Sequence, residues 1–320
     1  MTGNGRVVRM PSAADLSRAE AVVRMYLDRT PVVVSEAVDE ALLKLDCLQP
    51  TGSFKVRGAL AALTALPDQA RAAGVVTASA GNHALGVAYA ASRLDVPATV
   101  VVPATASPAK IEALRGFAIE VVLHGRGYSE AEQHALDLTA KGSTYISAYN
   151  DPEVIAGQAS IAAELREQVD GPMTIVAPIG GGGLLAGLSL WAADHADVHV
   201  IGVEAAASRA VSAAVAAGRT VHVEVAETLA DGLAGNLEQD CITPAIIARY
   251  ADEITSVSEQ EIRRAIRFLA SQHGLVVEGA GAVAVAALLA EKVNPTGRTV
   301  AVVTGRNIAL PALATVLAPE

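Results

Sequence analysis

The residue of this sequence best suited to covalent chemistry is Lys55, in the segment LQPTGSFKVRG at residues 48–58. Leu60 and Leu63 follow it at helical spacing, so the pattern predicts a helix that starts beside the lysine. We expect Ser53 to cap this helix, because its hydroxyl can accept a backbone N–H of the first turn. The positive end of the helix dipole then disfavours an ammonium on Lys55, and the neutral amine is the form that makes a Schiff base with a carbonyl. A solvated surface lysine is the ordinary alternative.

A second segment with chemical potential is SAGNHA at residues 79–84, where an expected apolar strand meets an expected helix. Backbone N–H groups at a helix start form an anion site, and Gly81 lets a ligand approach the backbone closely. Asn82 offers both a donor and an acceptor to a ring substituent. A carboxylate suits this SAGNHA segment, although an ordinary strand-to-helix turn with an idle His83 has the same pattern.

The third segment is PIGGGGLLAG at residues 178–187, in which four consecutive glycines follow a strand and open a helix. Successive backbone N–H groups of this glycine loop (residues 180–183) can surround a phosphate without interference from side chains. Gly181, Gly183 and Ala186 also fit the G-x-G-x-x-A fingerprint of dinucleotide sites, and Glu204 ends the next strand, where a ribose-binding acid is expected. A nicotinamide or flavin nucleotide, or a glycine-rich turn made only for close packing, therefore stays open on this segment alone.

The three segments taken together favour pyridoxal phosphate as the cofactor. The lysine would form the Schiff base, the glycine loop would bind the phosphate, and the SAGNHA segment would bind the carboxylate of an amino-acid substrate. A dehydrogenase would leave the first two segments without a purpose.

Composition excludes several other classes. The 320 residues are 52% hydrophobic and carry a net charge of -10, which argues against a nucleic-acid or anionic-membrane surface. Cys47 and Cys241 form no metal-spaced pair, as expected for a reducing compartment. No apolar run reaches membrane-spanning length, and the N-terminal residues lack the apolar core of a signal peptide. We therefore expect a cytoplasmic protein.

Short apolar strands alternate with longer helices along the chain. Strands are expected at residues 31–35, 41–47, 74–79, 98–103, 119–123, 144–148, 173–178, 198–204 and 299–304, and helices from residue 12, near residue 55, at 80–94, 108–116, 129–141 and 152–169, from 183, and at 209–217, 259–273 and 281–292. Such alternation predicts an α/β protein with mostly parallel sheets. The strands are too many for one sheet, so we expect two doubly wound lobes with the cofactor in the cleft between them. A TIM barrel is disfavoured, because the spacing is irregular and a helix precedes the first strand.

These three segments, with ETLADGLAGN at residues 227–236 and VVEGAGAVAVAALL at 276–289, resemble the threonine/serine dehydratase and serine racemase family. The members of this family are pyridoxal-phosphate enzymes of the tryptophan-synthase-β fold type. The resemblance covers nearly the whole chain and is to the catabolic members, which have no regulatory domain. It also implies that the protein is a homodimer. We expect a large cofactor-binding domain from residues 1–64 plus 150–320 and a small substrate-binding domain from residues 65–149.

The resemblance also implies roles for individual residues. Lys55 would form the Schiff base and move the Cα proton, Phe54 would pack near the cofactor ring, and Asn82 would hydrogen-bond the ring hydroxyl oxygen. Thr304 falls where the family has a serine or cysteine against the pyridine nitrogen, and Glu278 matches a family glutamate near the active site. The phosphate would be bound by Gly180, Gly181, Gly182, Gly183 and Leu184. The substrate carboxylate would be bound by Ser79, Ala80, Gly81 and His83.

The neutral hydroxyl of Thr304 bears on the reaction type. A carboxylate at the pyridine nitrogen would hold it protonated and make the ring a strong electron sink, whereas a hydroxyl does not. The carbanion at Cα is then less stabilised, which favours rapid loss of a β-substituent. This indicates β-elimination, with a 2-oxo acid and ammonia as the products.

Three positions depart from the family pattern. The racemases have a second serine where this chain has Ala80, so the proton donor on the opposite face is missing and elimination is favoured. The family's divalent-metal site pairs a glutamate, matched here by Glu204, with an acid that is Ala210 in this chain, so we expect no metal. Arg306 stands where a glycine is expected, and a guanidinium suits a substrate with a second carboxylate.

We therefore expect a threonine or serine ammonia-lyase. A 3-hydroxyaspartate dehydratase, and an amino-acid racemase or β-replacement enzyme on the same fold, stay open as alternatives. A nucleotide-binding oxidoreductase or a ligand-binding module is the remaining one.

Overall fold

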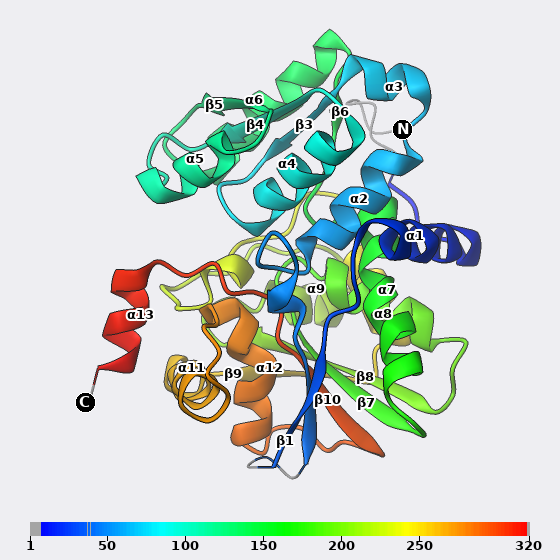
Figure 1. Ribbon diagram of the computed structural model, residues 1–320, viewed down its shortest axis with the longest axis vertical. Coiled ribbons are helices and arrows are strands. Elements are labelled where there is room, and N and C mark those ends of the chain that lie inside the picture. Colours follow the sequence, from blue (N-terminus) through cyan, green and yellow to red (C-terminus); the bar gives the residue numbers. More distant parts are fainter. Residues whose placement is uncertain (1–7, 37, 39, 319–320) are drawn as a thin grey trace. The chain divides into compact units, whose positions relative to one another are not determined.

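The computed structural model describes residues 8–36, 38 and 40–318, and the chain forms two compact units. The first unit comprises Met1–Leu27 and Lys55–Gly157, and the second comprises Asp28–Phe54 and Gln158–Glu320. The expected domains grouped residues 1–27, 55–64 and 150–157 with the large domain, whereas these contact units group them with the first unit. Each unit contains one sheet, drawn in Figure 1.

The first unit is built on a four-stranded parallel sheet with the order β5-β4-β3-β6. Its strands are β3 (Val75–Ala78), β4 (Ala98–Val102), β5 (Glu120–Leu123) and β6 (Thr144–Tyr145), and its helices are α1 (Ala13–Tyr26), α2 (Lys55–Ala65), α3 (Asp68–Ala73), α4 (Asn82–Leu94), α5 (Pro108–Arg115) and α6 (Tyr128–Leu138). Val75 and Val100 pack on the side of α4, while Val76 and Val101 pack against α6. The sheet is therefore covered on both faces, as parallel sheets are.

The second unit is built on a six-stranded sheet with the order β1-β2-β10-β7-β8-β9, in which only the β1–β2 pair is antiparallel. Its strands are β1 (Val32–Ser35), β2 (Ala41–Lys44), β7 (Met173–Pro178), β8 (Val198–Ala205), β9 (Glu253–Val257) and β10 (Arg298–Val302). Its helices are α8 (Gly183–Ala192), α9 (Ala210–Ala217), α10 (Thr243–Tyr250), α11 (Glu259–His273), α12 (Gly279–Leu289) and α13 (Leu310–Leu317), and α7 (Pro152–Gln168) begins in the first unit and ends in the second.

Opposite faces of this second sheet carry α8 and α12. A Cβ placed on Gly202 of β8 would lie 2.4 Å from Leu185 of α8, whereas its neighbours Ile201 and Val203 belong to the core cluster that includes α11 and α12. Successive residues of a strand face opposite sides of the sheet. The prediction of an α/β protein with two mostly parallel, doubly covered sheets is thus confirmed.

A buried ion pair anchors β2, the strand that leads to the lysine segment. Lys44 is fully buried, and its Nζ donates to Glu164 Oε2 at 2.6 Å, Gln168 Oε1 at 2.7 Å and the Thr30 carbonyl at 2.9 Å. A buried ammonium requires this number of acceptors, because desolvation would otherwise exceed the attraction of one carboxylate. The pair ties β2 to the second half of α7.

Four elements were not predicted: α3, α10, β9 and α13. β9 is an edge strand of which only Val257 is buried, so it has no run of apolar residues to reveal it. The helices α3, α10 and α13 have only six to eight residues, so they offer too few turns for a clear helical period.

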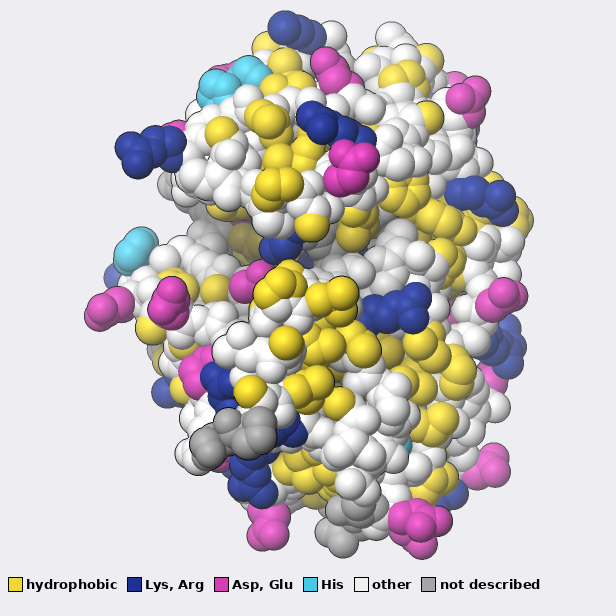
Figure 2. Space-filling model, turned by 60° about the vertical axis from the view of Figure 1, so that its left-hand side comes forward, with side chains coloured by type: hydrophobic (Ala, Val, Ile, Leu, Met, Phe, Trp, Pro, Cys, Tyr) yellow, Lys and Arg dark blue, Asp and Glu magenta, His cyan; other side chains and the backbone are white. Residues whose placement is uncertain are grey.

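The surface agrees with the charge balance of the sequence. On the face drawn in Figure 2, acidic and basic side chains are interspersed and no broad basic patch appears among the described residues. Of the described helices, none combines the length and the apolar character that crossing a bilayer demands.

Close helix packing surrounds α2 in the first unit. A Cβ on Gly157 of α7 would lie 2.6 Å from Gly58 Cα, 2.7 Å from the Arg57 carbonyl oxygen and 2.9 Å from Ala61 Cβ. The two backbones approach so closely only because both helices have a glycine at the crossing.

We expect Gly157→Ala to lower the stability of the protein by about 1–3 kcal/mol, because the added methyl group has no space at this crossing. The measurement is the thermal midpoint followed by circular dichroism. Gly127→Ala is the matched control, since a Cβ there meets nothing within 4 Å, and it should change stability little. A Gly157→Ala protein as stable as the control would contradict the close crossing.

Candidate active site

Lys55 is the first residue of α2, as the sequence indicated. Its Nζ donates to the Ala148 carbonyl at 2.9 Å. The preceding residue, Phe54, donates its N–H to the Thr304 carbonyl at 3.0 Å. The backbone immediately before the lysine is therefore hydrogen-bonded to the segment that contains Thr304. The structure thus has Lys55 at the helix start where the sequence predicted it.

The capping role predicted for Ser53 is wrong. Its Oγ is buried and has no hydrogen-bond partner in the part of the chain that the structure describes. Ser53 instead forms an isolated bridge through its backbone with Gly305. The backbone of residue 53 is therefore held by the strand-end segment that contains Thr304, and its hydroxyl is a buried polar group left without a partner.

The SAGNHA segment leaves an open helix start in the first unit, where an anion could bind. β3 ends at Ala78, and α4 begins at Asn82 with Gly81 as an N-cap that has no side chain to accept the helix N–H groups. Within residues 8–36, 38 and 40–318, no acceptor is recorded for the N–H of His83 or Ala84. A Cβ on Gly81 would meet nothing within 4 Å, so a ligand has room at this helix start.

The lysine and the SAGNHA segment lie close together within the first unit. A Cβ on Gly86 of α4 would lie 3.1 Å from the backbone C and O of Lys55 and from the N of Val56. The glycine allows α4 to pack directly on the first turn of α2. The structure thus brings together the helix start that could bind a carboxylate and the helix start that carries the lysine.

His83 is placed inward, unlike the rest of its segment. Its ring is buried, and Nε2 donates to the Ile146 carbonyl at 3.1 Å, which leaves Nδ1 as a buried acceptor without a partner among the described residues. Burial, with a smaller contribution from the charge of Lys55, lowers the pKa of His83 to about 3. The neutral ring cannot supply positive charge to a substrate carboxylate. Only the backbone N–H of His83 could therefore donate to such a carboxylate.

The glycine loop in the second unit has the backbone geometry of an anion site. β7 ends at Pro178 and α8 begins at Gly183, with Gly182 as its N-cap in a left-handed conformation at φ +86°. In the described part of the chain, no acceptor is recorded for the N–H groups of Gly181, Gly182, Gly183 and Leu184. Four consecutive donors without acceptors match the oxygens of a phosphate group. The loop therefore fits the phosphate of the predicted cofactor.

Thr304 lies at the same edge of this sheet as the glycine loop. It follows β10, which pairs in parallel with β7, and ligands of parallel α/β sheets bind at the carboxyl ends of the strands. Thr304 is 2% exposed, and its hydroxyl makes no hydrogen bond to the residues that the structure describes. That hydroxyl is free to pair with a ring nitrogen.

Glu204 is used by the fold. Its Oε1 accepts the N–H of Val211 at 2.9 Å and of Ser212 at 3.2 Å, so the carboxylate caps α9, and burial raises the pKa of Glu204. The Glu204 side chain is only 1% exposed, so it is not available to a ribose hydroxyl. The alternative of a dinucleotide site therefore lacks the ribose-binding acid that it requires. No group of three His, Cys, Asp or Glu side chains suited to a metal occurs among the described residues.

Thr243 was missed by the sequence analysis. It is the first residue of α10, it is fully buried, and its Oγ1 donates to the Gly181 carbonyl at 2.6 Å. A proline at the second position of a helix is a recognised start signal, and the Thr-Pro pair could have revealed α10. Its contact with the glycine loop is tertiary and has no signature in the sequence.

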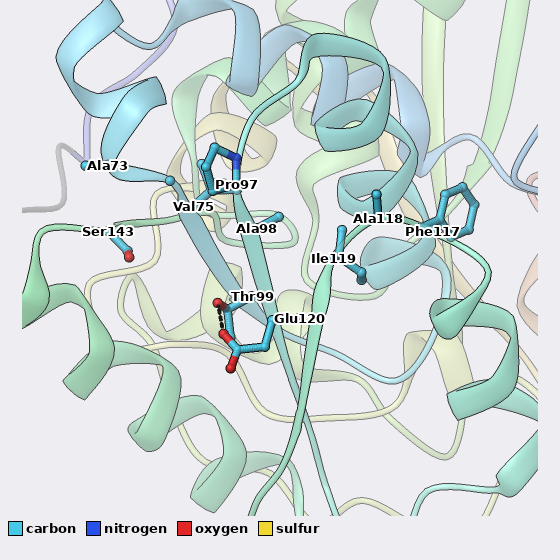
Figure 3. Close-up of a pocket in the computed structure, with 11 residues that line it drawn as sticks. Ala73, Val75, Pro97, Ala98, Thr99, Phe117, Ala118, Ile119, Glu120 and Ser143 are labelled. Carbon is cyan, nitrogen blue, oxygen red and sulfur yellow. Dashed lines mark hydrogen bonds between the residues drawn. The ribbon is translucent and has the colours of Figure 1, made fainter.

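A separate pocket of about 470 Å³ lies at the amino ends of β3, β4 and β5, as Figure 3 shows. Its polar lining includes Glu120, which accepts a hydrogen bond from Thr99 at 2.9 Å. None of the predicted site residues lines it, and it lies at the edge opposite to the SAGNHA segment. We assign no part of the chemistry to this pocket.

The pyridoxal-phosphate-dependent enzyme family matches residues 23–305 of this sequence. The chain belongs to this family. The family and the cofactor expected from the sequence are thus confirmed.

Three proteins illustrate the similarity. An L-threonine ammonia-lyase of Thermotoga maritima is 40% identical over 93% of this chain and 76% of its own length. A threonine deaminase of Solanum lycopersicum superposes with a TM-score of 0.88 at 30% identity, covering 100% of this chain and 99% of that chain. A pyridoxal 5'-phosphate-dependent aspartate racemase has a TM-score of 0.88 at 30% identity, covering 96% and 99%.

The buried neutral ring of His83 predicts a specific acid sensitivity. Because its pKa is about 3 in the folded protein and about 6.5 in the unfolded chain, the unfolded chain binds the extra proton between these values. The contribution of His83 to the free energy of unfolding is therefore fully present above pH 6.5. Between pH 6.5 and pH 3 this contribution falls by about 1.4 kcal/mol per pH unit.

We expect His83→Gln, which keeps a donor for the Ile146 carbonyl, to lose less thermal stability than the parent protein between pH 7 and pH 5. His222→Gln at an exposed histidine is the control and should follow the parent protein. Equal pH dependence in the parent and in His83→Gln would show that the ring is not held neutral.

Proposed function

We propose that this chain catalyses the pyridoxal-phosphate-dependent β-elimination of a hydroxyamino acid, threonine or serine, and releases a 2-oxo acid and ammonia. The observation that carries the proposal is the packing of the first turn of the Lys55 helix against Gly86, in the second turn of the helix that the SAGNHA segment opens. A lysine amine beside a carboxylate site is the arrangement that acts on the Cα proton of an amino acid. The 40% identical threonine ammonia-lyase supports the same reaction.

The proposed roles follow the chemistry of each group. When bound, pyridoxal phosphate supplies the electron sink for charge that develops at Cα. Lys55 would hold the cofactor covalently and then take the Cα proton on Nζ, while Asn82 would hydrogen-bond the ring hydroxyl oxygen and Phe54 would pack near the ring. Thr304 would pair its free hydroxyl with the pyridine nitrogen.

Backbone N–H groups would bind both anionic groups. Those of the SAGNHA segment would orient the substrate carboxylate, and those of the glycine loop would hold the cofactor phosphate. The phosphate residues proposed are Gly180, Gly181, Gly182, Gly183 and Leu184, and the carboxylate residues are Ser79, Ala80, Gly81 and His83. The Ser79 hydroxyl already accepts the Gly81 N–H at 3.1 Å, so it shapes the turn as well.

Elimination is favoured over racemisation at this site. Ala80 offers a methyl group where a hydroxyl would be needed to deliver a proton to the opposite face of Cα. We also propose that the protein acts as a homodimer in the cytoplasm, as its family resemblance implies.

Incubation of the protein with L-threonine and L-serine tests the proposal, with 2-oxo acid measured by absorbance and D-serine by chiral chromatography. We expect Lys55→Ala to lower 2-oxo acid release by about 10³-fold or more, because the proton-transfer group is lost. Lys141→Ala at an exposed lysine is the control. Near-normal turnover in Lys55→Ala, or D-serine in amounts equal to pyruvate, would overturn the assignment.

A second candidate substrate is suggested by Arg306, which lies two residues beyond Thr304. Its N–H is bonded to the Gly52 carbonyl at 2.9 Å, while its side chain is exposed and has no acidic partner in the part of the chain that the structure describes. An unpaired guanidinium suits a carboxylate. The similar aspartate racemase shows that this fold can handle an amino acid with a second carboxylate. The candidate is 3-hydroxyaspartate.

Comparing kcat/KM for L-threonine, L-serine and 3-hydroxyaspartate tests this candidate. If Arg306 contacts the second carboxylate, Arg306→Gln should reduce kcat/KM for the diacid by more than about tenfold and leave the other two substrates unchanged. Arg298→Gln, at an exposed arginine that begins β10, the strand preceding Arg306, is the control. An equal effect on all three substrates would exclude 3-hydroxyaspartate recognition by Arg306.

A further inference from the structure

The carbonyl of Gly181 in the glycine loop accepts a hydrogen bond from Thr243, a residue to which the family match gives no role. Thr243 Oγ1 donates to the Gly181 carbonyl at 2.6 Å, and Thr243 is fully buried. A carbonyl can only accept, so the single hydroxyl proton of Thr243 is committed to it. Cys241 Sγ lies 3.1 Å from the same Oγ1 and must therefore be the donor of that contact. Two hydrogen bonds fix the orientation of the threonine hydroxyl.

The bond to Gly181 determines where the next N–H points. In a planar trans peptide the C=O and N–H groups point in opposite directions. Because the Gly181 carbonyl points at Thr243, the N–H of Gly182 points away from α10. This N–H is one of those with no acceptor among the described residues.

Helix α10 packs closely against the loop at this point. A Cβ on Gly182 would lie 2.7 Å from Thr243 Oγ1 and 2.9 Å from Ile247 Cδ1, so the first turn of α10 rests directly on this glycine. Gly182 has φ +86°, and glycines resist peptide rotation less than other residues. Without the Thr243 hydroxyl, the Gly181–Gly182 peptide would lose the hydrogen bond that fixes the direction of its carbonyl.

We propose that Thr243 is a positioning residue for the cofactor phosphate. It holds the Gly181 carbonyl so that the N–H of Gly182 stays directed to the phosphate. The inference rests on the proposed role of the glycine loop, and it adds a residue from an element that neither touches the phosphate nor takes part in the reaction.

The test is the dissociation constant of pyridoxal phosphate for the apo-protein, measured by absorbance titration. Thr243→Val keeps the shape of the side chain and removes the hydroxyl, so we expect the dissociation constant to rise about tenfold. Thr243→Ser keeps the hydroxyl and should bind as the parent protein does. If Thr243→Val fails to fold, Thr243→Ala removes the same hydroxyl with a smaller side chain.

Thr174→Val is the matched control. Thr174 is also fully buried and also donates to a backbone carbonyl, that of Thr296 at 2.8 Å, but it lies at the opposite end of β7 from the glycine loop. Thr243→Val loses the hydroxyl contacts with the Gly181 carbonyl and Cys241 Sγ, and Thr174→Val loses those with the Thr296 carbonyl and N–H. Each valine variant therefore loses two buried hydrogen bonds, and we expect similar decreases in the thermal midpoint of the apo-protein. Only Thr243→Val should weaken cofactor binding and shift the ³¹P resonance of the bound phosphate.

Two results would overturn the inference: parent-like cofactor binding and an unshifted ³¹P resonance in Thr243→Val, or equal weakening in Thr174→Val. Failure of the proposed reaction would look different. In that case the parent protein would still bind pyridoxal phosphate but would release no 2-oxo acid, and the comparison of dissociation constants would remain valid. Weaker binding of inorganic phosphate to Thr243→Val than to Thr174→Val would support the inference without the cofactor ring.

Discussion

At the starts of α4 and α8, backbone N–H groups have no acceptor in the described part of the chain. The types of the neighbouring residues follow from this lack of acceptors. A helix start normally recovers these donors with a serine, threonine or aspartate cap. Here Gly81 and Gly182 occupy the cap positions, and neither has a side chain that could accept these N–H groups. An unpaired buried N–H lowers stability by an amount comparable to a lost hydrogen bond, so an anionic ligand would suit both helix starts.

The charged groups of the protein are arranged to leave these two starts available. Glu204, the acid that the dinucleotide interpretation associated with the glycine loop, accepts backbone N–H groups at the start of α9 instead. His83 is kept neutral by burial, so it adds no charge next to the lysine amine. Backbone dipoles at these two helix starts would let a chain of net charge -10 bind an anion without a cluster of basic side chains.

The sequence predicted local features well because their causes are local. A lysine after a glycine-serine turn, four glycines after a buried strand, and alternating elements each leave a pattern within about ten residues. Those features led to the correct fold class, family and cofactor. The failures concern contacts between distant segments. Ser53 could not be known to pair through its backbone with Gly305, nor could the ring of His83 be known to turn toward Ile146. The contact of Thr243 with Gly181 spans 62 residues and leaves no periodic trace.

The close approach at Gly86 has a mechanical consequence. With α4 resting on the first turn of α2, neither helix can slide along the other without a clash between backbones. A ligand bound at the start of α4 would therefore rest on the same packed pair of helices that carries Lys55. Motion of the unit as a whole would leave the spacing between these two helix starts unchanged.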